Sequence, residues 1–132
     1  MTIYHWSLRK RKKTGGKKVP YRGKRAYEVG RNPIETKIVK GKDAVEIVRV
    51  RGGGIKLKLK ATGFVNVSSK DGKTQRTEIQ SLVSNPSNML YARRGILTKG
   101  AIAKTPLGNV KITSKPSISG TLNGILLSSS GA

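Results

Sequence analysis

The chain has 132 residues, of which 28 are Lys or Arg and 6 are Asp or Glu, so its formal net charge at pH 7 is +22. Its length allows one domain with a modest core, and the absence of Cys excludes disulfides and thiolate metal sites. No apolar run reaches the roughly 18 residues of a membrane span and no secretion signal is recognisable, so a cytoplasmic protein without a membrane partner is expected. A chain this basic requires a polyanionic partner, and nucleic acid supplies one negative charge per ~1.7 Å of duplex.

Residues 1–33 are predicted to form an extended basic arm. The first 31 residues hold eleven Lys or Arg, one acid and four of the six aromatic residues, Tyr4, Trp6, Tyr21 and Tyr27. Ordering each residue costs about 1–2 kcal/mol of backbone entropy, which an arm with so few aliphatic residues cannot offset. We therefore expect the arm to be disordered when free and extended when bound, with one helical turn at 24–29 ended by Gly30. Its aromatic side chains either stack on unpaired bases or pack on the body.

Residues 34–127 are predicted to form an all-β body. Turn residues separate short β-rich runs at 36–40, 44–51, 55–61, 64–68, 74–83, 96–98, 101–104, 110–113 and 122–127. Many short strands at close spacing are typical of a barrel or sandwich, and the predicted fold is a small β-barrel of short antiparallel strands. Residues 128–132 are expected to form a flexible tail.

Three stretches of the body carry more specific signals. Residues 55–61 alternate, and the face expected to be buried carries Ile55, Leu57, Leu59 and Ala61. Asp71-Gly72 predicts a two-residue hairpin turn. Asn85-Pro86 begins either a helical turn capped by Asn85 or a plain turn.

The sequence offers few residues for catalysis. His5, the one His, lies in the arm without partners for a metal, and Asp43 and Glu46 would point to opposite faces of a strand. Gly72-Lys73-Thr74 resembles the end of a phosphate-binding loop, but Val67 stands where that motif requires Gly. We therefore expect no enzyme activity, no metal, no cofactor and no small-molecule substrate.

Two basic groups in the body are candidates for nucleic-acid contact. Arg49 and Arg51 precede Gly52-Gly53-Gly54, which forms either a bulged hairpin turn or a site where the backbone approaches a phosphate. A second group shares one strand face and comprises Lys56, Lys58 and Lys60. That face is solvated, protects an edge strand or contacts RNA. Since residues 32–132 still hold 17 Lys or Arg against 5 acids, contact with RNA is the favoured interpretation.

Several short motifs extend over nearly the whole chain. In the arm they are Arg11-x-x-Thr14-Gly15-Gly16 and Arg22-x-Lys24-Arg25-x-Tyr27-Glu28-Val29-Gly30-Arg31. In the body they are Thr36-Lys37, Arg49-Val50-Arg51-Gly52-Gly53, Asn85-Pro86-Ser87-Asn88, Leu97-Thr98-Lys99-Gly100-Ala101-Ile102 and Gly120-x-x-Asn123-Gly124-x-Leu126-Leu127. Together they resemble the signature of the S8e family of small-subunit ribosomal proteins, in its compact archaeal form.

The resemblance implies a non-enzymatic structural protein that binds and stabilises small-subunit ribosomal RNA, beside neighbouring ribosomal proteins of the cytoplasmic ribosome. The residues expected to contact RNA are Arg9, Lys10, Arg11, Lys12, Lys13, Thr14, Gly15, Gly16, Lys17, Lys18, Arg22, Lys24, Arg25, Tyr27, Arg31, Lys37, Arg49, Arg51, Gly52, Gly53, Lys56, Lys58, Lys60, Asn85, Ser87, Asn88, Arg93, Arg94 and Lys99. A chromatin-type DNA-binding protein is the alternative, because charge does not separate the two classes. The scarcity of His and acidic residues argues against an enzyme or a nucleotide-binding factor. The lack of a recognisable signal segment argues against a secreted membrane-active protein.

Overall fold

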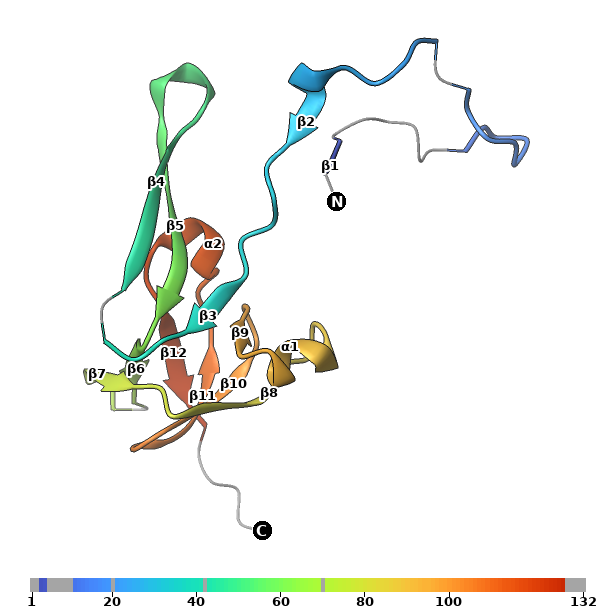
Figure 1. The fold of residues 1–132 in the computed structure, drawn as a ribbon. Helices are drawn as coiled ribbons and strands as arrows, with labels where there is room; N and C mark the ends of the chain where they lie inside the picture. Colours follow the sequence, from blue (N-terminus) through green and yellow to red (C-terminus); the bar gives the residue numbers. More distant parts are fainter. Residues whose placement is uncertain (1–2, 5–10, 20, 42, 70, 128–132) are drawn as a thin grey trace. The chain divides into compact units, whose positions relative to one another are not determined.

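The computed structural model describes residues 3–4, 11–19, 21–41, 43–69 and 71–127 (Figure 1). The chain divides into two compact units, Met1–Pro33 and Ile34–Ala132. Within the described ranges, no helix is both long and apolar enough to cross a membrane, and no three His, Cys, Asp or Glu side chains gather as a metal site. Several residues discussed above lie outside the described part, namely His5, Trp6, Arg9, Lys10 and the tail 128–132.

The first unit contains one short strand pair and one helical turn. Strand β1 (Ile3–Tyr4) pairs antiparallel with β2 (Val29–Gly30), and the 3-10 turn η2 (Ala26–Glu28) comes directly before β2. The helical turn expected at 24–29 is therefore confirmed in part, but it ends earlier than Gly30. Val29 is the C-cap and is already extended, the conformation that a β-branched residue prefers.

A four-stranded sheet forms one side of the second unit, and its strand order is β4-β5-β3-β9. The bounds are β3 (Thr36–Ile38), β4 (Ala44–Arg49), β5 (Ile55–Thr62) and β9 (Ile96–Leu97). Strand β5 pairs with β4 along nearly its whole length but with β3 only at Ala61 and Thr62. The outer half of the β4–β5 hairpin therefore extends beyond β3 (Figure 1).

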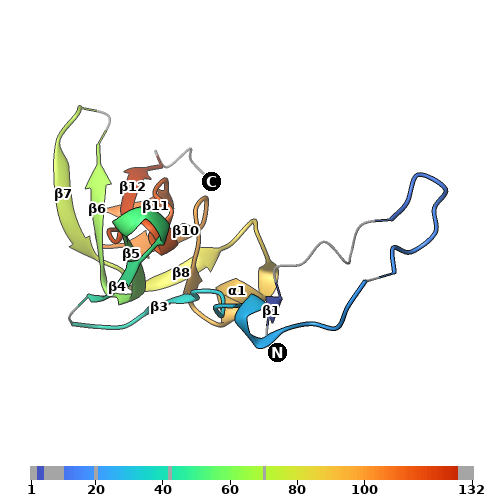
Figure 2. The same ribbon diagram turned by 90° about the horizontal axis from the view of Figure 1, so that it is seen from above.

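A six-stranded sheet curls into the barrel-like part of the second unit, in the order β7-β6-β12-β11-β10-β8. The bounds are β6 (Phe64–Ser68), β7 (Thr74–Glu78), β8 (Ser81–Ser84), β10 (Ile102–Thr105), β11 (Gly108–Ile112) and β12 (Asn123–Leu126). Strands β7 and β8 lie at opposite edges of this sheet, yet only Ile79 and Gln80 separate them in the chain. So short a connection brings the two edges close together, and the sheet curls (Figure 2).

The core is built mainly by strand residues, together with Ile79, Ala101 and Leu122 from the connections between strands. Its buried members are Leu59, Val65, Val67, Ile79, Leu97, Ala101, Ala103, Val110, Ile112 and Leu122. The buried Thr36 hydroxyl donates to the Leu59 carbonyl at 2.6 Å, whereas the Thr77 hydroxyl is buried without a hydrogen bond among the described residues. The predicted all-β, barrel-like fold is confirmed, and each expected β-rich run contains a strand. The strands are not all antiparallel, because β3 pairs parallel with β5 and β12 pairs parallel with β6.

Two turns differ from the prediction. The expected strand 74–83 is broken at Ile79 and Gln80, whose amides bond to Gly63 and Lys104 instead of continuing one ladder. The hairpin at Asp71-Gly72 is confirmed, but its turn is longer than two residues: the Ser69 amide bonds to the Lys73 carbonyl, which leaves three residues in the loop.

Two short helices are also present. Residues 86–87 form a plain turn, one of the two alternatives for the segment that begins at Asn85, and the first helix starts only after it. Helix α1 (Met89–Arg93) is capped by Asn88, whose Oδ1 accepts from the Leu90 amide at 2.9 Å, so Asn85 is not the cap. Helix α2 (Pro116–Ser119) begins at a proline, whose fixed φ and missing N–H suit the first helical position. Both helices are too short for hydrophobic periodicity to reveal them.

Candidate nucleic-acid interface

The first basic group is a tight turn in the first unit, which we call the arm turn (residues 11–18). Arg11 and Lys17 form an isolated antiparallel bridge, and the Gly15 amide donates to the Lys12 carbonyl at 3.0 Å. Gly15 has φ +85°, a conformation that residues with a side chain rarely adopt. The turn gathers exposed cations, namely Arg11, Lys12, Lys13, Lys17 and Lys18. Their mutual repulsion disfavours this geometry unless an anion lies close by.

Arg22 organises a second group in the same unit. Its guanidinium forms an ion pair with Glu28 and donates to the Tyr21 hydroxyl at 3.0 Å. It also lies 5.3 Å from the Tyr21 ring centroid and 6.0 Å from that of Tyr27. The bond from Arg22, followed by one from the Arg25 amide, lowers the pKa of Glu28, and Glu28 raises the pKa of Arg22. Arg22 thus positions two exposed tyrosines, a role that the sequence did not indicate.

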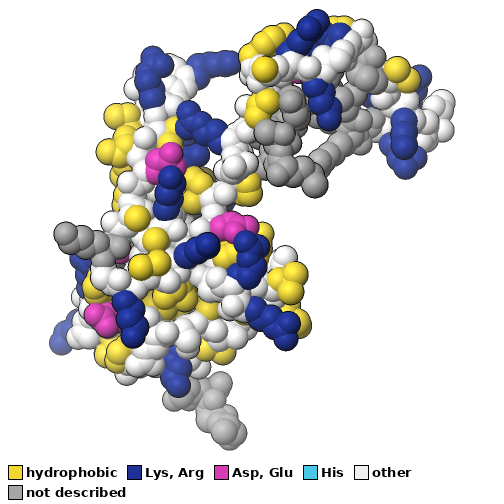
Figure 3. Space-filling view, viewed as in Figure 1, with side chains coloured by type: hydrophobic (Ala, Val, Ile, Leu, Met, Phe, Trp, Pro, Cys, Tyr) yellow, Lys and Arg dark blue, Asp and Glu magenta, His cyan; other side chains and the backbone are white. Residues whose placement is uncertain are grey.

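The tip of the β4–β5 hairpin is the third group. The Val50 amide donates to the Gly54 carbonyl at 2.8 Å across the 3-10 turn η3 (Arg51–Gly53). Gly52 and Gly53 have φ +81° and +79°, and no heavy atom lies within 4 Å of the position a Cβ would take at either residue. The segment is therefore a hairpin turn, and its backbone is also open to a phosphate. Arg49 and Arg51 are exposed beside it. Figure 3 shows Lys and Arg side chains at the surface of this end of the hairpin.

The two faces of this hairpin differ in chemistry. Cross-strand pairs place Ile47 opposite Leu57 on one face and Glu46 opposite Lys58 on the other. On the second face Lys56 and Lys60 are exposed and Lys58 is half-buried, while Lys60 lies 3.4 Å from Glu46. Strand β3 reaches β5 only at Ala61 and Thr62, so beside the lysines the described residues give that edge of β5 only the isolated bridge from Leu57 to Ser119. Protection of a strand edge therefore stays an alternative to RNA contact for this face.

The aliphatic face was expected to be buried along its whole length, and that prediction is wrong for its outer half. Leu59 is 1% exposed, but Leu57 is 42% and Ile55 is 67% exposed. Ile47 on β4 is 69% exposed as well. Alternation assigns residues to one face correctly, but here no layer of the second unit covers that face fully beyond β3.

The remaining predicted contacts lie around α1 and β3. Lys37, Ser87, Asn88, Arg93 and Lys99 are exposed. Arg94 is exposed too, but its guanidinium forms two bonds with the Glu35 carboxylate, at 2.6 and 3.4 Å.

Asn85 differs from its neighbours because it is 6% exposed and its side chain is used inside the protein. Its Nδ2 donates to the Ile96 carbonyl at 3.1 Å, and its Oδ1 accepts from the Ser87 amide and the Thr98 hydroxyl. The structure therefore gives Asn85 the task of holding the loop before α1.

A further polar group lies where β5 ends and β6 begins, and it joins Asp43 to Arg76 of β7; the sequence pointed to Asp43 only as an acid and did not point to Arg76. Asp43 and Arg76 form an ion pair with a 2.9 Å contact, and Arg76 lies over the Phe64 ring. The register after the Asp71-Gly72 hairpin, which places Arg76 opposite Asn66 and near Phe64, is the one signal that could have revealed part of it.

Comparison with known proteins gives a consistent picture. Residues 5–127 match the family described as Ribosomal protein S8e. The small ribosomal subunit protein eS8 of Staphylothermus marinus is 51% identical over 118 residues, which are 89% of this chain and 91% of that protein. The eS8 protein of Nanoarchaeum equitans is 50% identical over 107 residues, 80% of this chain and 83% of the relative. That of Sulfolobus acidocaldarius is 44% identical over 125 residues, 94% of this chain and 97% of the relative.

Proposed function

This chain belongs to the ribosomal protein S8e family, and we propose that it binds and stabilises small-subunit ribosomal RNA as a structural, non-enzymatic component of the ribosome. Its partners are that RNA and neighbouring proteins of the subunit, in the cytoplasm. The observation that carries the proposal is the arm turn, whose five cations make no ion pair with an acid among the residues that the structure describes.

The proposed mechanism is charge neutralisation where RNA strands lie close together. Each Lys or Arg that replaces condensed counterions at a phosphate releases them, which drives binding. Arg49 and Arg51 can donate two hydrogen bonds to one phosphate, and the open backbone at Gly52 and Gly53 permits close approach. Arg22, held by Glu28, presents Tyr21 and Tyr27 to unpaired bases. These groups lie in both units, so the proposed interface uses the arm and the body.

A salt titration tests the electrostatic character of binding. If about ten phosphates are neutralised, log K against log salt concentration has a slope of about −7 to −9. Filter binding or fluorescence anisotropy with small-subunit ribosomal RNA measures it. A slope shallower than about −3 contradicts a protein embedded in RNA. Duplex DNA at matched salt is the control, and equal affinity for DNA favours a chromatin-type protein instead.

We also expect the arm turn, residues 11–18, to be mobile in the free protein. The cations of the arm repel each other, and few aliphatic side chains are available to hold them. Amide NMR signals of residues 11–18 should be narrow and poorly dispersed, beside dispersed signals from the body. RNA binding should remove the narrow set. Dispersed, exchange-protected arm amides without RNA contradict this prediction.

A further inference from the structure

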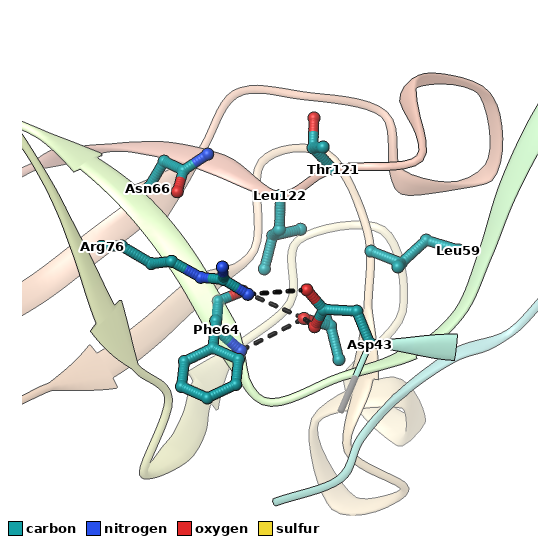
Figure 4. Close-up of a pocket in the computed structure, with 8 residues that line it drawn as sticks. Asp43, Leu59, Phe64, Asn66, Arg76, Thr121 and Leu122 are labelled. Atoms are coloured by element: carbon teal, nitrogen blue, oxygen red, sulfur yellow. Dashed lines mark hydrogen bonds and ion pairs between the residues drawn. The ribbon is translucent and has the colours of Figure 1, made fainter. Parts of the chain in front are cut away.

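A small pocket lies where the two sheets of the second unit meet (Figure 4). Its volume is about 120 Å³, and the side chains that line it include Asp43, Phe64, Asn66, Arg76, Thr121 and Leu122. Pockets for drug-sized molecules measure about 300–1,000 Å³, so this one accepts only a small group. One acid among its lining residues is too few for a metal site.

The Arg76 guanidinium is fixed at this pocket by two contacts. Its Nη2 lies 2.9 Å from Asp43 Oδ2, and its central carbon lies 4.6 Å from the centroid of the Phe64 ring. Asp43 is itself held, because its Oδ1 accepts from the Thr62 hydroxyl. The Arg76 side chain nevertheless remains 60% exposed. Exposed ion pairs contribute little to folding, so stability alone is a weak reason for this arrangement.

The arrangement suits a flat, aromatic ligand. In the view of Figure 4, Phe64 lies on one side of the Arg76 guanidinium, and Asn66 and Thr121 lie on the other. Guanidinium planes stack on nucleobases, and a cation packed on an aromatic ring is pre-oriented to do so. The base would complete a stack in which Arg76 is the middle layer.

The pocket wall also offers hydrogen-bonding atoms to the edge of a base. Asn66 Nδ2 donates to Asn123 Oδ1 at 3.0 Å, which leaves Asn66 Oδ1 without a hydrogen bond among the described residues. The Thr121 hydroxyl also has no hydrogen bond within the described part of the chain, where only the Thr121 carbonyl accepts bonds. Every nucleobase that pairs carries an N–H on its edge, so these acceptors fit a base without strict selection. Stacking supplies the affinity, and the sequence preference is modest.

We propose that this pocket, the base pocket, holds one unpaired nucleobase of the bound RNA, stacked on Arg76. The proposal rests on the proposed RNA-binding function and adds a specific contact to it. Phosphate contacts place a protein on RNA, whereas an extruded base held in a pocket fixes its position at one nucleotide. The base pocket would thus determine where the body sits.

Two substitutions at one position separate stacking from charge. Arg76→Lys keeps the charge and loses the plane, while Arg76→Gln loses the charge. Stacking on the guanidinium predicts that both weaken binding to transcribed archaeal small-subunit ribosomal RNA by about tenfold or more at ~0.15 M salt. If Arg76→Lys binds as tightly as the unchanged protein, Arg76 contacts at most a phosphate and the base pocket is wrong. Thermal unfolding of each variant shows whether the body remains folded.

Ultraviolet crosslinking of the unchanged protein gives a test that needs no variant. The base pocket predicts a crosslink between one nucleotide and the segment from Phe64 to Arg76, found by mass spectrometry of the digested complex. Phe64→Leu should abolish that crosslink while crosslinks to the arm persist. A complex that forms without a crosslink to this segment overturns the base pocket and leaves the proposed function intact. Failure of the unchanged protein to bind the RNA overturns the proposed function itself.

Discussion

Deletion of residues 1–31 is expected to weaken binding to small-subunit ribosomal RNA by several kcal/mol and to leave cooperative unfolding of the body nearly unchanged. The deleted segment carries 11 of the 28 basic residues, and each lost phosphate contact forgoes counterion release. Among the residues that the structure describes, the buried aliphatic core belongs to the second unit. Ordering the arm has an entropic cost, so the loss is smaller than the sum of its contacts. Isothermal titration and urea denaturation of the two chains measure the two effects.

A charge-conserving pair of variants refines this test. Gly15→Ala places a side chain at φ +85° and should distort the arm turn, so RNA binding weakens although no cation is removed. Gly16→Ala lies at an ordinary φ, with 3.9 Å from its added Cβ to the Thr14 hydroxyl, and should weaken binding less.

If the body that lacks residues 1–31 binds RNA as tightly as the full chain at ~0.15 M salt, the arm is not the principal anchor. The interface would then centre on Arg49, Arg51 and the row Lys56, Lys58, Lys60.

The strands could be predicted because alternation is a local property. Residues 64–68 alternate between half-buried and buried side chains, and in residues 55–61 the buried Leu59 lies between the half-buried Lys58 and the exposed Lys60. The break at Ile79 and Gln80 could not be predicted, since it exists only because two distant sheet edges meet there. For the same reason the sequence could not show that Ile47 and Ile55 lack a covering layer. Local pattern determines which residues share a face, and tertiary contacts determine whether that face is covered.

In the candidate site, residues that are contiguous in the sequence could be predicted, whereas contacts between residues distant in the sequence could not. A basic run such as residues 9–18 can be recognised from the sequence alone. The structure adds that residues 11–18 of this run form a tight turn. The Asp43–Arg76 pair joins residues 33 positions apart, so no motif reveals it. Asn85 illustrates the opposite case: a polar residue in a loop motif suggested contact with RNA, which stays a prediction, and the structure adds that its side chain holds that loop.

The second large effect concerns the boundary between core and surface along β5. Leu59→Ala is expected to lower the free energy of unfolding by about 2 to 5 kcal/mol, because Leu59 is 1% exposed and its removal leaves a cavity in the core. Ile55→Ala, on the same strand and the same face, should lower it by less than about 1 kcal/mol, since Ile55 is 67% exposed. Urea denaturation followed by circular dichroism gives both values.

Comparing Leu59→Ala with Ile55→Ala tests whether the aliphatic face of β5 is covered at one end and exposed at the other. Both substitutions remove aliphatic atoms from one face of β5, four residues apart, so the two positions share a strand and a face and differ in burial. Similar losses at both positions would show that the outer half of the β4–β5 hairpin is covered in the free protein, contrary to the exposure of Ile47 and Ile55. Measuring the RNA affinity of Ile55→Ala tests a separate point, namely whether the lysine face binds RNA independently of the aliphatic face. The lysines Lys56 and Lys58 lie on the opposite face, so their contacts with RNA should persist when the aliphatic face is trimmed.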